Sequence, residues 1–189
     1  MNKIFTSFKT VARAYNKVRT ELWDLRVLWD GSRLEKVGCT YLMIAPIAAL
    51  AGYMGLYQPE EKTIELPSVY LPIAALWRDL GVKANALDVI RHEFGHALAD
   101  LYPGALKKGG IFRKAFGGMY CDKPALNAGV SEFVSEYAAS STQEDFAETF
   151  MLFMKHKGKI PAKFAKSPVI RKKWKVVAEI VKRVAAAAR

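Results

Sequence analysis

The chain has 189 residues, of which 51% are hydrophobic and 25% are charged. This composition excludes intrinsic disorder, collagen-like sequence and low complexity, and the length suffices for one domain with a sizeable core. Two cysteines, Cys39 and Cys121, cannot form a disulfide framework. The net charge of +11 is distributed unevenly along the chain. Residues 1–36 hold 8 basic and 4 acidic residues, residues 37–154 hold 9 basic and 13 acidic residues, and residues 155–189 hold 12 basic residues and 1 acidic residue. The basic excess therefore lies in the last segment, which carries +11, whereas the middle segment carries −4.

Apolar residues between positions 4 and 29 recur at alternating steps of four and three residues, the spacing of one seam along a helix. They are Ile4, Phe8, Val11, Tyr15, Val18, Leu22, Leu25 and Trp29. We expect a long amphipathic helix that ends at Gly31-Ser32 and packs on its own domain; a helix that binds a partner is the alternative. Lysines and arginines interrupt the first twenty residues, so no cleavable secretory signal is expected. The compartment stays open between the cytoplasm and export by a non-classical route.

The stretch Val37–Pro59 has 23 residues without a formal charge, long enough to span a bilayer. Pro46, Gly52, Gly55, Thr40 and three tyrosines disfavour a membrane helix, and the alternating sequence Thr63-Ile64-Glu65-Leu66 follows a turn directly after the stretch. We therefore expect buried strands here rather than membrane insertion. Residues 69–80 are open between a helix and a loop.

A helix is predicted over residues 85–101, with Asn85 as its cap, Asp88 in its first turn, and Pro103-Gly104 after its end. One face is apolar and consists of Leu87, Ile90, Phe94, Leu98 and Leu101. The glycine-rich residues 104–130 predict irregular structure. Further helices are expected over residues 142–155, capped by Ser141 or Thr142, and over residues 169–184, with a basic face beside an apolar stripe.

The helix over residues 85–101 carries the motif His92-Glu93-Phe94-Gly95-His96. Two histidines four residues apart lie one helical turn apart, so both imidazoles can bind one metal ion while Glu93 stands beside the open coordination position. A catalytic zinc lowers the pKa of its bound water to about 7 and needs a carboxylate that accepts and passes on the proton. Glu93 is placed for that task.

A catalytic site needs a third ligand, and the remaining histidine, His156, lies among lysines in a segment that we expect to be solvated. Glu144 and Glu148 offer two carboxylates one turn apart on the helix predicted over residues 142–155. One of them can bind the metal while the other accepts the outer N–H of a ligating histidine.

These motifs resemble the gluzincin metallopeptidases, and within them the group of the anthrax lethal factor catalytic domain and the Pro-Pro endopeptidases. The resemblance rests on His92-Glu-Phe-Gly-His96-Ala, on Glu144-Asp-Phe-Ala-Glu148-Thr-Phe, and on Tyr137 seven residues before Glu144. It implies that His92, His96 and Glu144 bind Zn²⁺, that Glu93 is the general base and acid, that Glu148 supports a ligand, and that Tyr137 donates to the oxyanion. It also implies that an edge strand near residues 51–57 or 63–66 pairs with the substrate backbone.

The expected fold is α+β: a small zincin-like domain over residues 34–154 with a short mixed sheet, an active-site helix and a second ligand helix. Helical extensions flank it, an amphipathic helix in residues 1–33 and a basic helical segment in residues 155–189. The expected function is zinc-dependent endopeptidase activity on a peptide or protein substrate. The alternative is a catalytically inactive binding or regulatory module that acts through its basic helices. An anionic partner for the basic helix is an open expectation, whereas nucleic-acid binding is disfavoured because no aromatic platform or known motif accompanies the charge.

Overall fold

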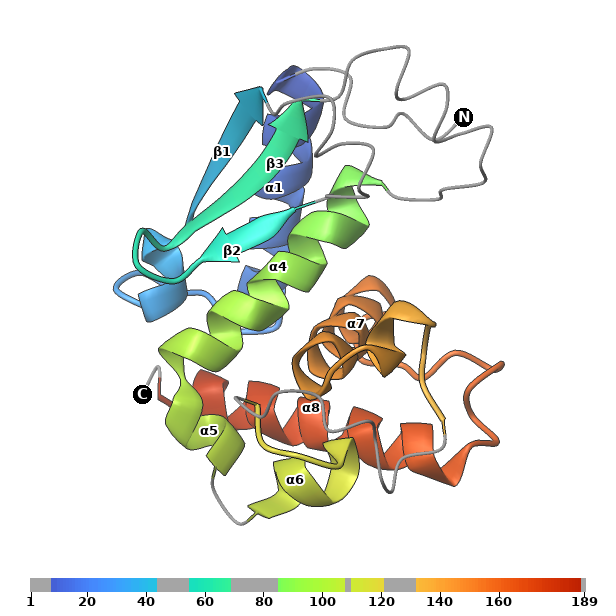
Figure 1. Cartoon of the computed structure of the whole chain (residues 1–189). Coiled ribbons are helices and arrows are strands. Elements are labelled where there is room, and N and C mark those ends of the chain that lie inside the picture. Colours follow the sequence, from blue (N-terminus) through green and yellow to red (C-terminus); the bar gives the residue numbers. More distant parts are fainter. Residues whose placement is uncertain (1–7, 44–54, 69–84, 108–109, 121–131, 188–189) are drawn as a thin grey trace, which may run out of the picture.

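The computed structural model describes residues 8–43, 55–68, 85–107, 110–120 and 132–187. This part of the chain forms a mixed α+β fold, mostly helical, with six α-helices and a small three-stranded sheet (Figure 1). The expected α+β class is therefore confirmed. None of the helices in the described ranges is both long and apolar enough to cross a membrane.

The sheet consists of β1 (Gly38–Met43), β2 (Leu56–Gln58) and β3 (Thr63–Ser68) in the order β1-β3-β2. The pairing of β1 with β3 is parallel, with Cys39 opposite Ile64, and that of β2 with β3 is antiparallel, with Tyr57 opposite Ile64. Ile64 and Leu66 are fully buried while the alternating residues Thr63 and Glu65 are only partly buried, which confirms the predicted alternation. The strands expected in Val37–Pro59 are present at its two ends, and residues 44–54 and 69–84 lie outside the described residues.

Helix α4 (Ala86–Leu101) runs past the sheet and confirms the helix predicted over residues 85–101. The side chain of Asn85 accepts a hydrogen bond from the backbone N–H of Asp88 at 2.9 Å, which satisfies one of the free donors at the helix start. The predicted apolar face is packed, since Ile90, Phe94 and Leu98 are completely buried. On the opposite face His92 and Glu93 are buried, Val89 and His96 are partly buried, and Asp100 is exposed.

Helix α1 (Phe8–Asp24) lies behind the sheet in Figure 1 and packs on α4 and β1. It ends at Asp24, so the prediction of a helix continuing to residue 29 is wrong at that end. The backbone N–H groups of Val27 and Leu28 both donate to the Leu22 carbonyl, and Arg26 adopts a left-handed conformation with φ of 56°. This turn, followed by the short 3₁₀ helix η1 (Arg33–Lys36), brings the chain into β1.

Two short helices, α5 (Pro103–Lys107) and α6 (Ile111–Phe116), lie where residues 104–130 were expected to be irregular. Gly110 and Gly117 flank α6 with φ angles of 63° and 80°, a conformation that glycine adopts without steric cost. A helix of six residues is too short to show a hydrophobic period, which is why the sequence pattern missed it. Residues 108–109 and 121–131 lie outside the described residues.

The remaining elements are the 3₁₀ helix η3 (Tyr137–Ala139), α7 (Thr142–Lys155) and α8 (Pro168–Ala186). Ser141 caps α7 and Ser167 caps α8, each accepting a backbone N–H three residues further on, so both predicted helices are confirmed. Helix α8 packs against α5, α6 and α7 (Figure 1). Side chains from α1, the sheet, α4, α7 and α8 join a single hydrophobic core.

Candidate metal centre

Helices α4 and α7 pack against each other at Gly95, the fourth residue of the histidine motif. A Cβ atom at this position would lie 3.0 Å from the backbone Cα of Ala147 and 3.3 Å from the ring of Phe150. The absence of a side chain therefore lets the two helices approach closely. This contact brings the first turn of α7 opposite the histidines of α4.

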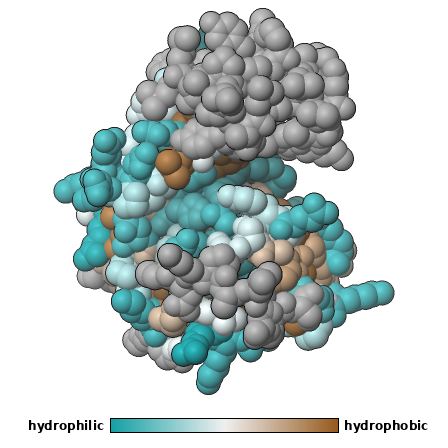
Figure 2. All heavy atoms as spheres, in the orientation of Figure 1, coloured by the Kyte–Doolittle hydropathy of each residue, from teal (hydrophilic) through white to brown (hydrophobic). Residues whose placement is uncertain are grey.

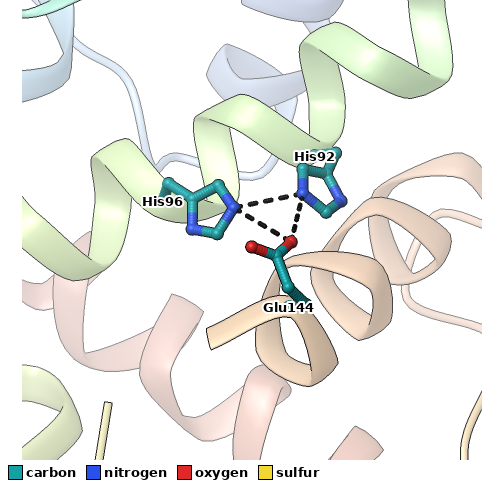
Figure 3. Close-up of side chains that lie close together, drawn as sticks. All are labelled: His92, His96 and Glu144. Carbon is teal, nitrogen blue, oxygen red and sulfur yellow. Dashed lines mark hydrogen bonds and ion pairs between the residues drawn. The ribbon is translucent and has the colours of Figure 1, made fainter. Parts of the chain in front are cut away.

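Three side chains from the two helices converge on one point: His92 and His96 from α4, and Glu144 from α7 (Figure 3). The Nε2 atom of His92 lies 3.1 Å from Nε2 of His96 and 2.9 Å from Oε2 of Glu144, and Nε2 of His96 lies 3.4 Å from the same oxygen. Tetrahedral zinc with ligands at about 2.0–2.2 Å separates its ligand atoms by about 3.3–3.6 Å. The three residues could therefore bind a metal ion after small outward shifts of their side chains.

The outer nitrogens of both imidazoles have hydrogen-bond partners. Nδ1 of His92 lies 2.9 Å from Oε1 of Glu148, and Nδ1 of His96 lies 2.7 Å from the Tyr120 hydroxyl. With the carboxylate of Glu148 as acceptor, Nδ1 of His92 carries a proton, and Nε2 can present a lone pair to a metal ion once it has released its own proton. The same tautomer of His96 donates to Tyr120. In these tautomers, two nitrogen lone pairs and a carboxylate oxygen would be available to a metal ion.

The electrostatics of the cluster favour a positive charge at this point. Oε2 of Glu144 is buried and lies 2.9 Å from Nε2 of His92, with which it forms an ion pair when that imidazole is protonated. Burial alone would lower the pKa of His92, but hydrogen bonds to Glu144 and Glu148 and the charge of Glu93 raise it to about 10. Burial would raise the pKa of Glu144, and the two imidazoles instead hold it well below its usual range. A divalent cation that replaced the proton on Nε2 of His92 would interact with both imidazoles and the carboxylate at once.

Glu93 lies beside the three ligands and is only 5% exposed. Burial raises the pKa of its carboxyl, while the charges of the imidazoles and a hydrogen bond from the Tyr57 backbone N–H oppose the increase. Gly55, immediately before β2, closes over it: a Cβ there would lie 3.0 Å from Oε1 of Glu93 and 2.6 Å from the side chain of Val89. The start of β2 therefore covers the carboxylate from the sheet side.

Tyr137 lies on η3, and its ring centroid is 5.7 Å from that of His92. The residue is 57% exposed, yet burial of its hydroxyl, the charges of Glu144 and Glu93, and a hydrogen bond to Glu144 raise its pKa above the usual value. Its hydroxyl is therefore a neutral donor directed at the centre. The sequence placed this residue near the site by resemblance, and the structure brings it there.

The centre opens into a cavity of about 670 Å³, which extends from the ligands to α5 and α6. Leu106, Phe112, Met119, Tyr137 and Gln143 are among the residues that line it. In the space-filling view, this face of the molecule is hollowed across its middle, where hydrophilic atoms are exposed (Figure 2). The centre is therefore accessible to a ligand larger than water.

The structure brings together all six residues singled out from the sequence: His92, Glu93, His96, Tyr137, Glu144 and Glu148. It adds two partners that the sequence did not identify. Tyr120 bonds His96, and Ser135 donates from Oγ to Oε2 of Glu148 at 2.6 Å while accepting the Ala138 N–H at 3.1 Å. Neither belongs to a periodic motif, so no sequence signal marked them. In comparisons with protein-family models, curated protein sequences and solved structures, no match to this chain was found.

Proposed function

We propose that this chain is a zinc-dependent endopeptidase with a zincin-like domain of the gluzincin type. The observation that carries the proposal is the convergence of the His92, His96 and Glu144 donors beside the buried Glu93. The resemblance of the two motifs to the gluzincin pattern supports the same assignment. The α+β arrangement, in which a helix bearing the histidines runs below a small sheet, agrees with such a domain.

Zinc fits the donor set because two imidazoles and one carboxylate, all within 4.8 Å, are the ligands of a catalytic zinc that keeps one position open. When bound, the metal would supply Lewis-acid polarisation of a carbonyl and would acidify a water molecule. His92, His96 and Glu144 would hold the ion. Glu148 and Tyr120 would fix the orientation of the two imidazoles through their outer nitrogens.

Glu93 would act as the general base and then as the general acid. Its raised pKa and its burial suit a carboxylate that accepts a proton from the attacking water and returns it to the leaving amine. The hydroxyl of Tyr137 would donate a hydrogen bond to the oxyanion that develops on the scissile carbonyl. The high pKa of this phenol keeps the donor protonated at neutral pH.

An extended peptide is the substrate form that agrees with the surroundings of the centre. β2 is the outer strand on its side of the described sheet, and it runs beside α4 above Glu93. A strand in this position can pair with a peptide backbone, while the cavity receives side chains. β3 lies between β1 and β2, which makes residues 56–58 the stronger candidate and residues 63–66 the weaker one.

The test compares metal content and proteolysis in matched variants. We expect one zinc per wild-type chain, loss of zinc in Glu144→Ala, and retained zinc with loss of peptide-library cleavage in Glu93→Gln. The last change keeps the shape of the side chain and removes its proton affinity, so cleavage should fall by about 10²–10⁴-fold. Absence of zinc from the wild type would contradict the metal centre, and full cleavage by Glu93→Gln would contradict the mechanism.

A second candidate function is a zincin-fold binding module without catalysis. The observation that favours it is the set of exposed basic side chains on α8 and on the segment before it, among them Lys159, Lys166, Arg171, Lys172 and Lys175. This surface suits an anionic partner. Zinc binding without cleavage of any library peptide, together with salt-sensitive binding of an acidic partner, would favour this function over the peptidase.

A further inference from the structure

Lys173 occupies the middle of α8 and is completely buried, with 0% of its surface exposed. Its Nζ lies 2.6 Å from Oδ2 of Asp145, which is itself 1% exposed, and it donates to the Glu132 carbonyl at 2.8 Å. The ring of Phe133 lies 4.3 Å from the same ammonium group. A buried lysine is rare in proteins and is normally paired with an acidic group. Here the partner is Asp145, so the ion pair links α8 to the first turn of α7.

Asp145 is adjacent in sequence to Glu144, in the first turn of α7. Successive residues of an α-helix point about 100° apart, so the Glu144 carboxylate faces α4 while that of Asp145 faces α8. The first turn of a helix is its least restrained part, because its N–H groups have no partners within the helix. Here Ser141 supplies the cap, and the Asp145–Lys173 ion pair supplies a lateral restraint.

Stability alone does not account for a buried ion pair. The desolvation of two charges offsets much of their attraction, and replacement of such a pair by uncharged groups of similar volume is often neutral or stabilising. What this ion pair adds is a local restraint, because the Glu132 carbonyl and the surrounding core hold Nζ of Lys173 in place, and its charge keeps the Asp145 carboxylate beside it. This restraint acts one residue from Glu144.

We propose that Lys173 is a positioning residue for the metal centre: through Asp145 it fixes the rotation of the first turn of α7, so that Glu144 Oε2 meets the two imidazoles. The inference rests on the metal centre of the proposed function. It makes α8 a structural part of that centre, although the sequence pattern marks residues 155–189 only as a basic extension. No contact between Lys173 and the metal or the substrate is involved.

The experiment separates metal affinity from stability with three variants of the full chain. Lys173→Met removes the charge and leaves Asp145 unpaired, and the double variant Lys173→Met/Asp145→Asn removes both charges. Val177→Ala is the matched control: it lies one turn further along α8, is also completely buried, and leaves a cavity without touching the ion pair. Zinc affinity is measured by competition with a chromophoric chelator, the cobalt absorption spectrum reports the ligand geometry, and thermal unfolding reports stability.

We expect the double variant to unfold close to the wild-type temperature, to bind zinc about 10–100-fold more weakly, and to show an altered cobalt spectrum. Val177→Ala should lower the unfolding temperature while the zinc affinity and the cobalt spectrum stay those of the wild type. Lys173→Met should lose both stability and zinc affinity. If this variant does not fold, the double variant still tests the inference.

Wild-type zinc affinity and spectrum in a folded double variant would overturn the inference and leave the metal centre intact. A loss of affinity in Val177→Ala equal to that of the double variant would also overturn it, because general loosening of α8 would then suffice. A wild-type chain that binds no metal would overturn the proposed function and this inference together.

Discussion

The two imidazoles of the centre differ in the groups that hold them. Nδ1 of His92 meets the carboxylate of Glu148, which Ser135 fixes in turn, whereas Nδ1 of His96 meets the neutral hydroxyl of Tyr120. A carboxylate partner makes an imidazole a stronger ligand than a phenol does. We therefore expect the His92 side of the centre to contribute more to metal affinity.

Removal of the Glu148 carboxylate tests this asymmetry. Glu148→Ala should weaken zinc binding by about 10–100-fold, because the imidazole of His92 loses the acceptor that fixes its tautomer and orientation. Glu148→Gln keeps an acceptor at the same place, so its loss of zinc affinity should be smaller than that of Glu148→Ala. The loss in Tyr120→Phe should also be smaller than that in Glu148→Ala. Chelator competition measures all three variants, and a larger loss in Tyr120→Phe than in Glu148→Ala would contradict the asymmetry.

Tyr137 gives a prediction about catalysis without metal loss. Its ring is 57% exposed and its hydroxyl is directed at the carboxylates of the centre, so Tyr137→Phe should leave folding and zinc content unchanged. If the hydroxyl donates to the oxyanion, kcat should fall by about 10²–10³-fold. Steady-state kinetics on a library-selected peptide measure the loss. An unchanged kcat would remove Tyr137 from the mechanism, and a loss of zinc would assign it to metal binding.

At the scale of elements, the centre depends on how closely α4 and α7 approach. The helices meet where Gly95 faces Ala147, and the first turn of α7 lies opposite the histidines only because this contact has no side chain. Gly95, the fourth residue of the motif, therefore allows the two helices to pack closely, whereas the spacing of His92 and His96 places the two imidazoles on one face. Close packing transmits a change in that contact to the ligands.

Gly95→Ala should both destabilise the fold and weaken the metal centre. The added Cβ would lie 3.0 Å from a backbone atom, which must move, and such overpacking costs about 1–3 kcal/mol. Gly104→Ala in α5 is the matched control, since no atom lies within 4 Å of its Cβ position. Urea unfolding should show a loss of stability, and chelator competition a loss of zinc affinity, in Gly95→Ala but not in Gly104→Ala. Wild-type values in both measurements would show that the helices approach closely for another reason.

The elements around the centre were predictable to the extent that their signals are local. The helices that begin at Asn85 and Ser141 have both a predicted cap and a period, the last helix has a period, and all three form as expected. The end of α1 was misplaced because the apolar seam continues through Leu25 into a turn in which Arg26 is left-handed. A hydrophobic seam predicts burial, and it does not distinguish a buried turn from a buried helix.

At the scale of the whole molecule, one ion-pair network joins three helices. Arg91 of α4, only 6% exposed, binds both carboxylate oxygens of Glu21 of α1 at 2.8 Å and reaches Asp88 at 2.7 Å. Lys155 at the end of α7 reaches the other oxygen of Asp88 at 2.6 Å. Asp88 therefore links α4 with α7 and, through Arg91, with α1.

The network predicts a pH dependence of stability. Burial would raise the pKa of Asp88, but Lys155, Asn85 and Arg91 together hold it below its usual value. A carboxyl with a lowered folded-state pKa stabilises the fold above its unfolded-state pKa and loses that contribution as the pH falls through the folded-state value. At pH 7 the free energy of unfolding of Asp88→Asn should therefore be about 1–3 kcal/mol lower than that of the wild type.

The difference in free energy of unfolding between the wild type and Asp88→Asn should become smaller as the pH falls below about 4, because the wild-type carboxyl then also loses its charge. Urea unfolding at pH 7, 5, 4 and 3 measures it. Asp30→Asn, an exposed position in the turn after α1, serves as the control with no expected narrowing. A difference that stays constant down to pH 3 would show that the Asp88 charge does not hold the network.

The sequence by itself determined the helices that carry the centre and the residues that face it. The spacing of His92 and His96, and of Glu144 and Glu148, is one helical turn, and helical spacing and capping depend on neighbours in the chain. The side of each helix on which a donor lies is therefore readable from the sequence. The alternation in Thr63–Leu66 was readable for the same reason.

Only the tertiary structure decided which groups complete the centre and which charges are buried. Tyr120 and Ser135 lie in segments without a period, and their partners are 24 and 13 residues away. Lys173 belongs by sequence to a basic helix, yet it is buried against Asp145, 28 positions earlier in the chain. Such contacts depend on how distant helices pack, and packing of this kind has no local signal because it arises from the shape of the whole core.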